Sequence, residues 1–163
     1  MVSLTFAQMN LALWLSCAVM PCLSAQVASR VRTASTEVTV GGTALHLVVD
    51  AWLNLQPGST AIPRDSLAIA PFRVIARVRA ATGARLPSGL RIDSAWVFTA
   101  RRGWGAAVAP DAATSDTIVV GRLWGGPLWV LKADSVDVVV RLDARGEASR
   151  YLRAPRVRLV RAQ

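Results

Sequence analysis

The strict alternation of side chains between residues 44 and 55 constrains the fold more than any other feature of the chain. Successive side chains of a β-strand point to opposite faces, so a period of two predicts a strand with one apolar face. One face would carry Leu45, Leu47, Val49, Ala51, Leu53 and Leu55, and the other His46, Val48, Asp50, Trp52 and Asn54. We therefore expect a long strand that buries one face in a core.

Comparable runs recur along the chain and are separated by turn residues such as Gly, Pro and Asp. The further predicted strands span residues 37–40, 72–80, 90–99, 116–123, 135–142, 149–153 and 156–161. The predicted buried rows are Phe72, Val74, Ala76 and Val78; Ile92, Ser94, Trp96 and Phe98; and Val136, Val138, Val140 and Leu142. Pro155 lacks an N–H group, so it predicts an edge position or a bulge in the last strand. Residues 101–115 are expected to form an exposed loop.

About seven short strands, without a convincing amphipathic helix, predict an all-β fold. Residues 66–70 would form one helical turn at most. The pattern favours a single antiparallel β-sandwich of immunoglobulin-like or fibronectin-like arrangement. A small closed barrel is the alternative.

The N-terminal segment is typical of an export signal. Residues 4–25 carry no charged side chain and end in Ser24 and Ala25, and residues 11–20 have the length of an apolar signal core. We expect a signal peptide over residues 1–25 and a folded domain over residues 26–163, located in the periplasm or secreted. Because no basic residue precedes the apolar run, an uncleaved membrane anchor is the alternative.

Both cysteines of the chain, Cys17 and Cys22, lie in this leader, so the expected domain has no disulfide and no thiol chemistry. The net charge is +9, and Lys132 is the only lysine among the nineteen basic residues. Such an excess of arginine favours an anionic partner, for example an acidic polysaccharide. Because the arginines are dispersed along many segments, a general compositional bias toward Arg and Ala is the favoured explanation of the same excess.

The C-terminal third of the chain carries a resemblance. Residues 134–155 read DSVDVVVRLDARGEASRYLRAP, and residues 126–129 read GPLW. These segments resemble the last hairpin and a Gly-Pro-x-Trp element of small exported bacterial β-sandwich proteins of unassigned function. The resemblance implies an immunoglobulin-like β-sandwich and implies no activity.

No catalytic constellation is visible in the sequence. The single histidine, His46, lies in the middle of a strand, and Asp50 on the same face is four residues away, which is about 13 Å along a strand. One histidine without a cysteine cannot supply an ordinary zinc site. The acidic residues Asp111, Asp116, Asp134, Asp137 and Asp143 are too dispersed to indicate calcium. We expect no catalytic residue, no cofactor and no metal.

Aromatic and arginine residues in the turns give the best indication of a binding surface. Trp96 is expected in the core, and Trp52 faces away from the apolar row of its strand. Arginine beside an exposed indole suits stacking on sugars, bases or a protein partner. The candidate partner surface is Arg101, Arg102, Trp104, Arg122, Trp124 and Trp129. The same tryptophans could instead fill the ends of the β-sandwich.

Three functional hypotheses remain open. The leading hypothesis is a non-catalytic exported binding or envelope-associated module, whose partner is an envelope protein or an anionic polysaccharide and not a nucleic acid. The second is a carboxylate-dependent enzyme acting on extracellular or cell-wall polysaccharide. The third is an accessory or inhibitor domain that pairs through an edge strand, for which residues 156–161 are the candidate.

Overall fold

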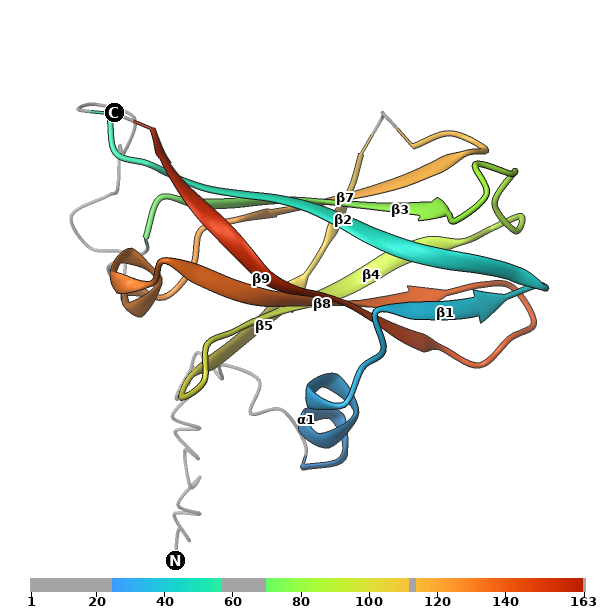
Figure 1. Cartoon of the computed structure of the whole chain (residues 1–163), viewed down its shortest axis with the longest axis horizontal. Helices are drawn as coiled ribbons and strands as arrows, with labels where there is room; N and C mark the ends of the chain where they lie inside the picture. Colours follow the sequence, from blue (N-terminus) through green and yellow to red (C-terminus); the bar gives the residue numbers. More distant parts are fainter. Residues whose placement is uncertain (1–24, 57–69, 112–113, 163) are drawn as a thin grey trace, which may run out of the picture.

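The computed structural model describes residues 25–56, 70–111 and 114–162 of the chain. The described part is mostly strand, as expected for an all-β protein (Figure 1). Its elements are α1 (Ala25–Arg32), β1 (Glu37–Val40), β2 (Thr43–Asn54), β3 (Phe72–Ala80), β4 (Arg91–Phe98), β5 (Gly103–Ala107), β6 (Ala109–Pro110), β7 (Ile118–Trp124), the 3-10 helix η1 (Leu128–Lys132), β8 (Ser135–Asp143) and β9 (Arg150–Ala162).

The strands form one curled sheet in the order β5-β4-β8-β9-β2-β3-β7-β6, and β1 pairs with β2 outside this path. The first part of β9 pairs with β8, and its end, Leu159 to Ala162, pairs with β2. In Figure 1, β9 crosses obliquely from one part of the sheet to the other. The β2–β9 pair is parallel, so the sheet is mixed and the expectation of a wholly antiparallel fold is wrong.

The core lies inside this curl, and three predicted strand faces are confirmed. The alternating residues of β2, β3 and β8 that were expected inside are buried or packed on one cluster, whereas Leu55 lies past the end of β2 and is exposed. The largest side chains of this cluster that are fully buried are Phe72, Leu45, Leu53, Leu142 and Leu152. Both parts of the sheet therefore contribute to one apolar interior.

The predicted row of β4 is wrong beyond Ile92. The register with β8 shifts between Ile92 and Ser94, which is a β-bulge that inverts the inward and outward positions after it. Ala95 and Val97 consequently face the main core, while Trp96 and Phe98 lie on the other side of the sheet.

A short helix that the sequence pattern does not predict covers this other side. Val31 of α1 is completely buried and forms a second apolar cluster with Trp96, Phe98 and Val139. Trp96 is thus buried, as expected, but in this second cluster. The helix is only eight residues long, so it offers too few turns for a clear helical period.

The prediction of a bulge at Pro155 is confirmed. Arg156 has a φ of 51°, and the register with β8 shifts opposite this position, between Val136 and Val138. Beyond the bulge β9 leaves β8 and joins β2. Residues 156–161 therefore lie within the sheet, so they are not the free edge that the third hypothesis required, and the ends of the described path are β5 and β6.

Residues 101–115, expected as a loop, contain the short strands β5 and β6. Two glycines let β5 lie close to the aromatic side chains of β4. A Cβ on Gly105 would lie 2.3 Å from Trp96 Cδ1, and a Cβ on Gly103 would lie 2.6 Å from Phe98 Cδ1. The indole and phenyl rings occupy the space above these glycines, which explains why a glycine-rich stretch forms a strand here.

Two expectations lie outside the described residues: the signal peptide up to Ser24, with Cys17 and Cys22, and most of the helical turn over residues 66–70. Within the part of the chain that is described, no helix has the length and apolar character needed to cross a membrane.

Candidate functional site

Acidic side chains of the described residues are engaged by arginine. Seven ion pairs account for every described aspartate. The pairs are Asp50–Arg77, Asp116–Arg85, Asp143–Arg91, Asp111–Arg122, Asp93–Arg141, Asp137–Arg153 and Asp134–Arg161. Glu147 accepts a hydrogen bond from the backbone N–H of Gly41 at 2.8 Å. These carboxylates therefore act as structural partners of cations and turns.

The pair between Asp93 and Arg141 has the most complete geometry. Arg141 Nε lies 2.8 and 2.9 Å from the two carboxylate oxygens, and Nη2 donates at 2.6 Å. Its hydrogen bond with Asp93 raises the pKa of Arg141 above its usual value. The pair fixes β4 to β8 next to the bulge and leaves no free charge there.

Because arginine outnumbers aspartate, many cations remain without an acidic partner. Arg101, Arg102 and Lys132 form no ion pair within the described chain and are exposed. They line a single hollow of about 820 Å³, which we call the basic hollow. The described residues that line it are Thr99, Ala100, Arg101, Arg102, Leu128, Trp129, Leu131, Lys132 and Ala133.

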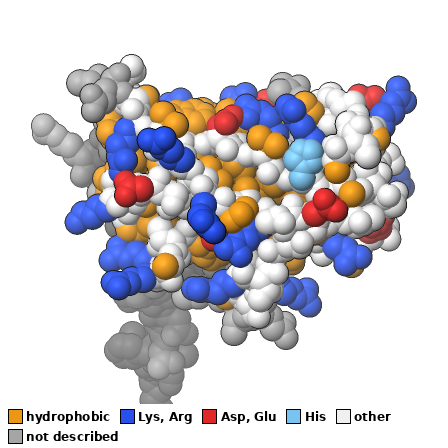
Figure 2. Space-filling view, in the orientation of Figure 1, with side chains coloured by type: hydrophobic (Ala, Val, Ile, Leu, Met, Phe, Trp, Pro, Cys, Tyr) orange, Lys and Arg blue, Asp and Glu red, His pale blue; other side chains and the backbone are white. Residues whose placement is uncertain are grey.

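Two elements build the basic hollow. The turn between β4 and β5 supplies the arginines, and it is closed by a hydrogen bond of 2.8 Å from Thr99 N–H to Arg102 C=O. The helix η1 supplies Trp129 and Lys132, and Trp129 is anchored because it packs against the main core. None of the described residues that line the hollow is acidic. Figure 2 shows basic side chains spread over the face of the molecule drawn there, with fewer acidic ones among them.

The structure brings together only part of the predicted partner surface. Arg101, Arg102 and Trp129 meet at the basic hollow. Arg122 and Trp124 lie on β7, where they line a different hollow of about 150 Å³. Trp104 packs against the main core, so this indole has a structural role. The six residues are therefore divided between two surfaces and the interior.

His46 is half-buried on β2, and its register partners are Glu37 on β1 and Arg79 on β3. Considering one strand alone identifies Asp50 as its nearest carboxylate and misses Glu37, because cross-strand neighbours depend on register. Among the described residues, no group of three or more His, Cys, Asp or Glu side chains could hold a metal ion.

Lys132 was missed as a site residue, although it is the only lysine. The signal that could have found it is its position three residues after Trp129, because one turn of a 3-10 helix places such residues on the same side. The resulting hollow combines an indole, aliphatic side chains and three cations. It is suited to holding an anion with an apolar surface. Comparison of the chain with protein-family models, with curated proteins and with solved structures found no match.

Proposed function

We propose that the protein is a non-catalytic, exported binding module whose ligand is an anionic component of the cell envelope, such as an acidic polysaccharide. The basic hollow carries this proposal. Its three cations have no acidic partner among the described residues, and Trp129 gives it an apolar wall. A concave site with positive charge and an aromatic surface attracts anions and holds their apolar parts.

Export and an immunoglobulin-like β-sandwich belong to the same proposal. The uncharged leader and a folded part without cysteine support export. A single core packed between two parts of the sheet, joined by β9, supports the sandwich arrangement. Detection of a processed N-terminus near Ala25 in a periplasmic or secreted fraction would test the export claim, and recovery of the unprocessed chain in the cytosol would contradict it.

The engagement of all seven described aspartates by arginine favours this function over carboxylate catalysis. A glycosidase needs an acid that faces the substrate, whereas each of these aspartates faces an arginine side chain of the protein itself.

The test is binding of the full chain to polygalacturonate, a carboxylated polysaccharide, at low and high salt. Replacement of Arg101, Arg102 and Lys132 by Gln should weaken binding about tenfold at low salt. The control carries the same loss of charge at Arg79, Arg145 and Arg150, which are exposed and lack an ion pair within the described residues. Equal losses in both variants would show that net charge, and not the hollow, is responsible.

A further inference from the structure

A second surface lies on the outer face of the sheet, where four strands place their side chains in one row. The register pairs Val160 of β9 with Trp52 of β2, Trp52 with Arg73 of β3, and Arg73 with Trp124 of β7. Residues that are directly opposite each other in a sheet share a face. We call these four residues the tryptophan row.

The row runs across four neighbouring strands, nearly perpendicular to them. Two strand spacings separate Trp52 from Trp124, which gives about 10 Å between their backbone positions. Arg73 lies between them, and its guanidinium carbon is 4.4 Å from the centre of the Trp124 ring. Trp124 is 54% exposed and Val160 is 60% exposed, so this face is open to solvent.

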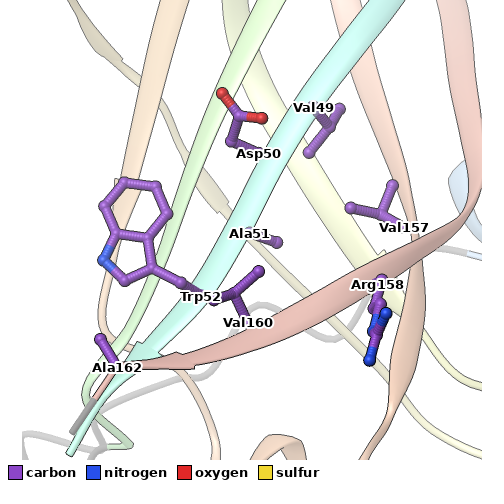
Figure 3. Close-up of a pocket in the computed structure, with 8 residues that line it drawn as sticks. All are labelled: Val49, Asp50, Ala51, Trp52, Val157, Arg158, Val160 and Ala162. Atoms are coloured by element: carbon purple, nitrogen blue, oxygen red, sulfur yellow. The ribbon is translucent and has the colours of Figure 1, made fainter.

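Hollows lie on both sides of Trp52. One of about 560 Å³ opens where β2 and β9 diverge, and Figure 3 shows Trp52 and Val160 at its edge, with Val49 and Val157 further along. The other, of about 150 Å³, extends from Trp52 past Arg73 to Trp124. A ligand lying across the strands would therefore meet both hollows.

The charges along this surface are mostly positive. Arg73 and Arg158 line the two hollows, and neither forms an ion pair within the described chain. Among the described residues that line these hollows, Asp50 is the one carboxylate, and it is bonded to Arg77. Arg122 in turn is bonded to Asp111. The cations without an acidic partner are available to an anionic ligand.

Packing does not explain these two indoles. The large tryptophan side chain contributes to folding mainly by burial. Neither Trp52 nor Trp124 belongs to the apolar clusters of the described residues or packs against them. An exposed indole, Trp124, and a half-buried indole, Trp52, lie on one face with a cation between them, and this arrangement indicates recognition of a ligand with rings and negative charge.

We propose that the tryptophan row binds an acidic polysaccharide, with sugar rings stacked on Trp52 and Trp124 and a sugar carboxylate paired with Arg73. This inference rests on the proposed function and adds a second contact surface with a stated role for each of three side chains. The apolar face of a sugar ring packs on an indole, and a guanidinium forms two parallel hydrogen bonds with a carboxylate.

The test measures binding of the full chain to four probes: polygalacturonate, the neutral oligosaccharide cellohexaose, polyglutamate and single-stranded oligo-dT. Trp52→Ala and Trp124→Ala should each weaken binding of polygalacturonate roughly tenfold. Arg73→Gln should reduce the preference for polygalacturonate over cellohexaose. Val48→Ala, an exposed change on the same face of β2, is the matched control and should stay within about twofold of the unchanged protein. Should Trp52→Ala fail to fold, Trp52→Phe replaces it, and Trp124→Ala tests the row by itself.

The inference would be overturned if the protein bound polyglutamate and polygalacturonate equally well and the tryptophan variants bound both as the unchanged protein does. Charge alone would then explain binding. Tighter binding of oligo-dT through the same tryptophans would also overturn it, in favour of a nucleic acid. Loss of polygalacturonate binding only in the basic-hollow variant would refute the row and leave the proposed function intact. If none of the four probes binds, both proposals fail.

Discussion

The two outer faces of the curled sheet differ in how far other elements cover them. On the part formed by β4 and β8, helix α1 covers Trp96, Phe98 and Val139. Val31 of this helix is fully buried against them. On the part formed by β2, β3 and β7, no helix of the described residues covers Trp52, Arg73 and Trp124, of which the first two are half-buried and the last is exposed. Aromatic residues occur on both faces, yet only the first face is part of the interior.

The sequences of the strands on the two parts of the sheet differ accordingly. β8 has three consecutive valines, Val138 to Val140, and all three are buried, because both of its faces are covered. β3 alternates apolar residues with Arg73, Arg77 and Arg79, which suits one buried and one solvated face. Aromatic side chains on a covered face should therefore stabilise the fold, and those on the open face should serve binding.

The largest effect should come from placing a charge on the covered face. Val31→Asp would bury a carboxylate among Trp96, Phe98 and Val139, and we expect a loss of about 3 kcal/mol or more in the free energy of unfolding, measured by urea denaturation. Val160→Asp on the open face should change that free energy by about 0.5 kcal/mol at most. Similar losses in both variants would show that α1 does not protect its face.

The glycines under the aromatic rings of β4 should give the next largest effect. Gly105→Val adds a Cβ 2.3 Å from Trp96 Cδ1, so the indole must move. We expect a loss of about 1–3 kcal/mol by thermal unfolding, with a change in tryptophan fluorescence. Ala107→Val, at an exposed position of the same strand, is the control. A stable Gly105→Val protein with unchanged fluorescence would contradict this contact.

The contribution of an ion pair to the free energy of unfolding should also increase with its burial. Asp93→Asn breaks the bidentate contact with Arg141 and should cost about 1 kcal/mol, whereas Asp116→Asn removes a 3.2 Å contact between mostly exposed side chains and should cost almost nothing. Urea unfolding at low salt and in concentrated NaCl measures both. A greater loss at Asp116 would reverse this ranking.

The smallest effect on folding should come from the open face. Trp124→Ala removes the contact with Arg73 and should lower the free energy of unfolding by only about 0.5 kcal/mol. A double-mutant cycle with Arg73→Gln isolates the coupling between the two side chains. A loss of several kcal/mol would show that this indole stabilises the fold, and would weaken its assignment to ligand binding.

The alternation in β2 and β3 predicts both their type and their buried faces, because a strand with one solvated face leaves a clear period of two. The pattern fails in β4 for a local reason: one bulge inverts the positions after Ile92, and both faces beyond it are apolar. It also fails for β5, whose glycines are typical of a loop until Trp96 and Phe98 are seen above them.

The candidate sites show the limit of sequence reasoning more clearly. Residue type alone identifies three candidates, Arg101, Arg102 and Trp129. That they meet at one hollow depends on where η1 lies relative to the turn after β4. The tryptophan row depends on register across four strands, and Trp52 and Arg73 are far from Trp124 in the sequence. Residue types are local information, whereas neighbours across a sheet are set by topology.

The position of β9 between β8 and β2 has a consequence for biogenesis. An early strand, β2, receives its parallel neighbour from the last strand of the described chain, so the sheet stays incomplete until β9 has left the ribosome. A nascent chain without β9 exposes apolar side chains and unpaired strand edges, which makes it a substrate for chaperones and proteases. Completion of the sheet therefore has to wait for β9, and β2 stays without its parallel neighbour during that delay.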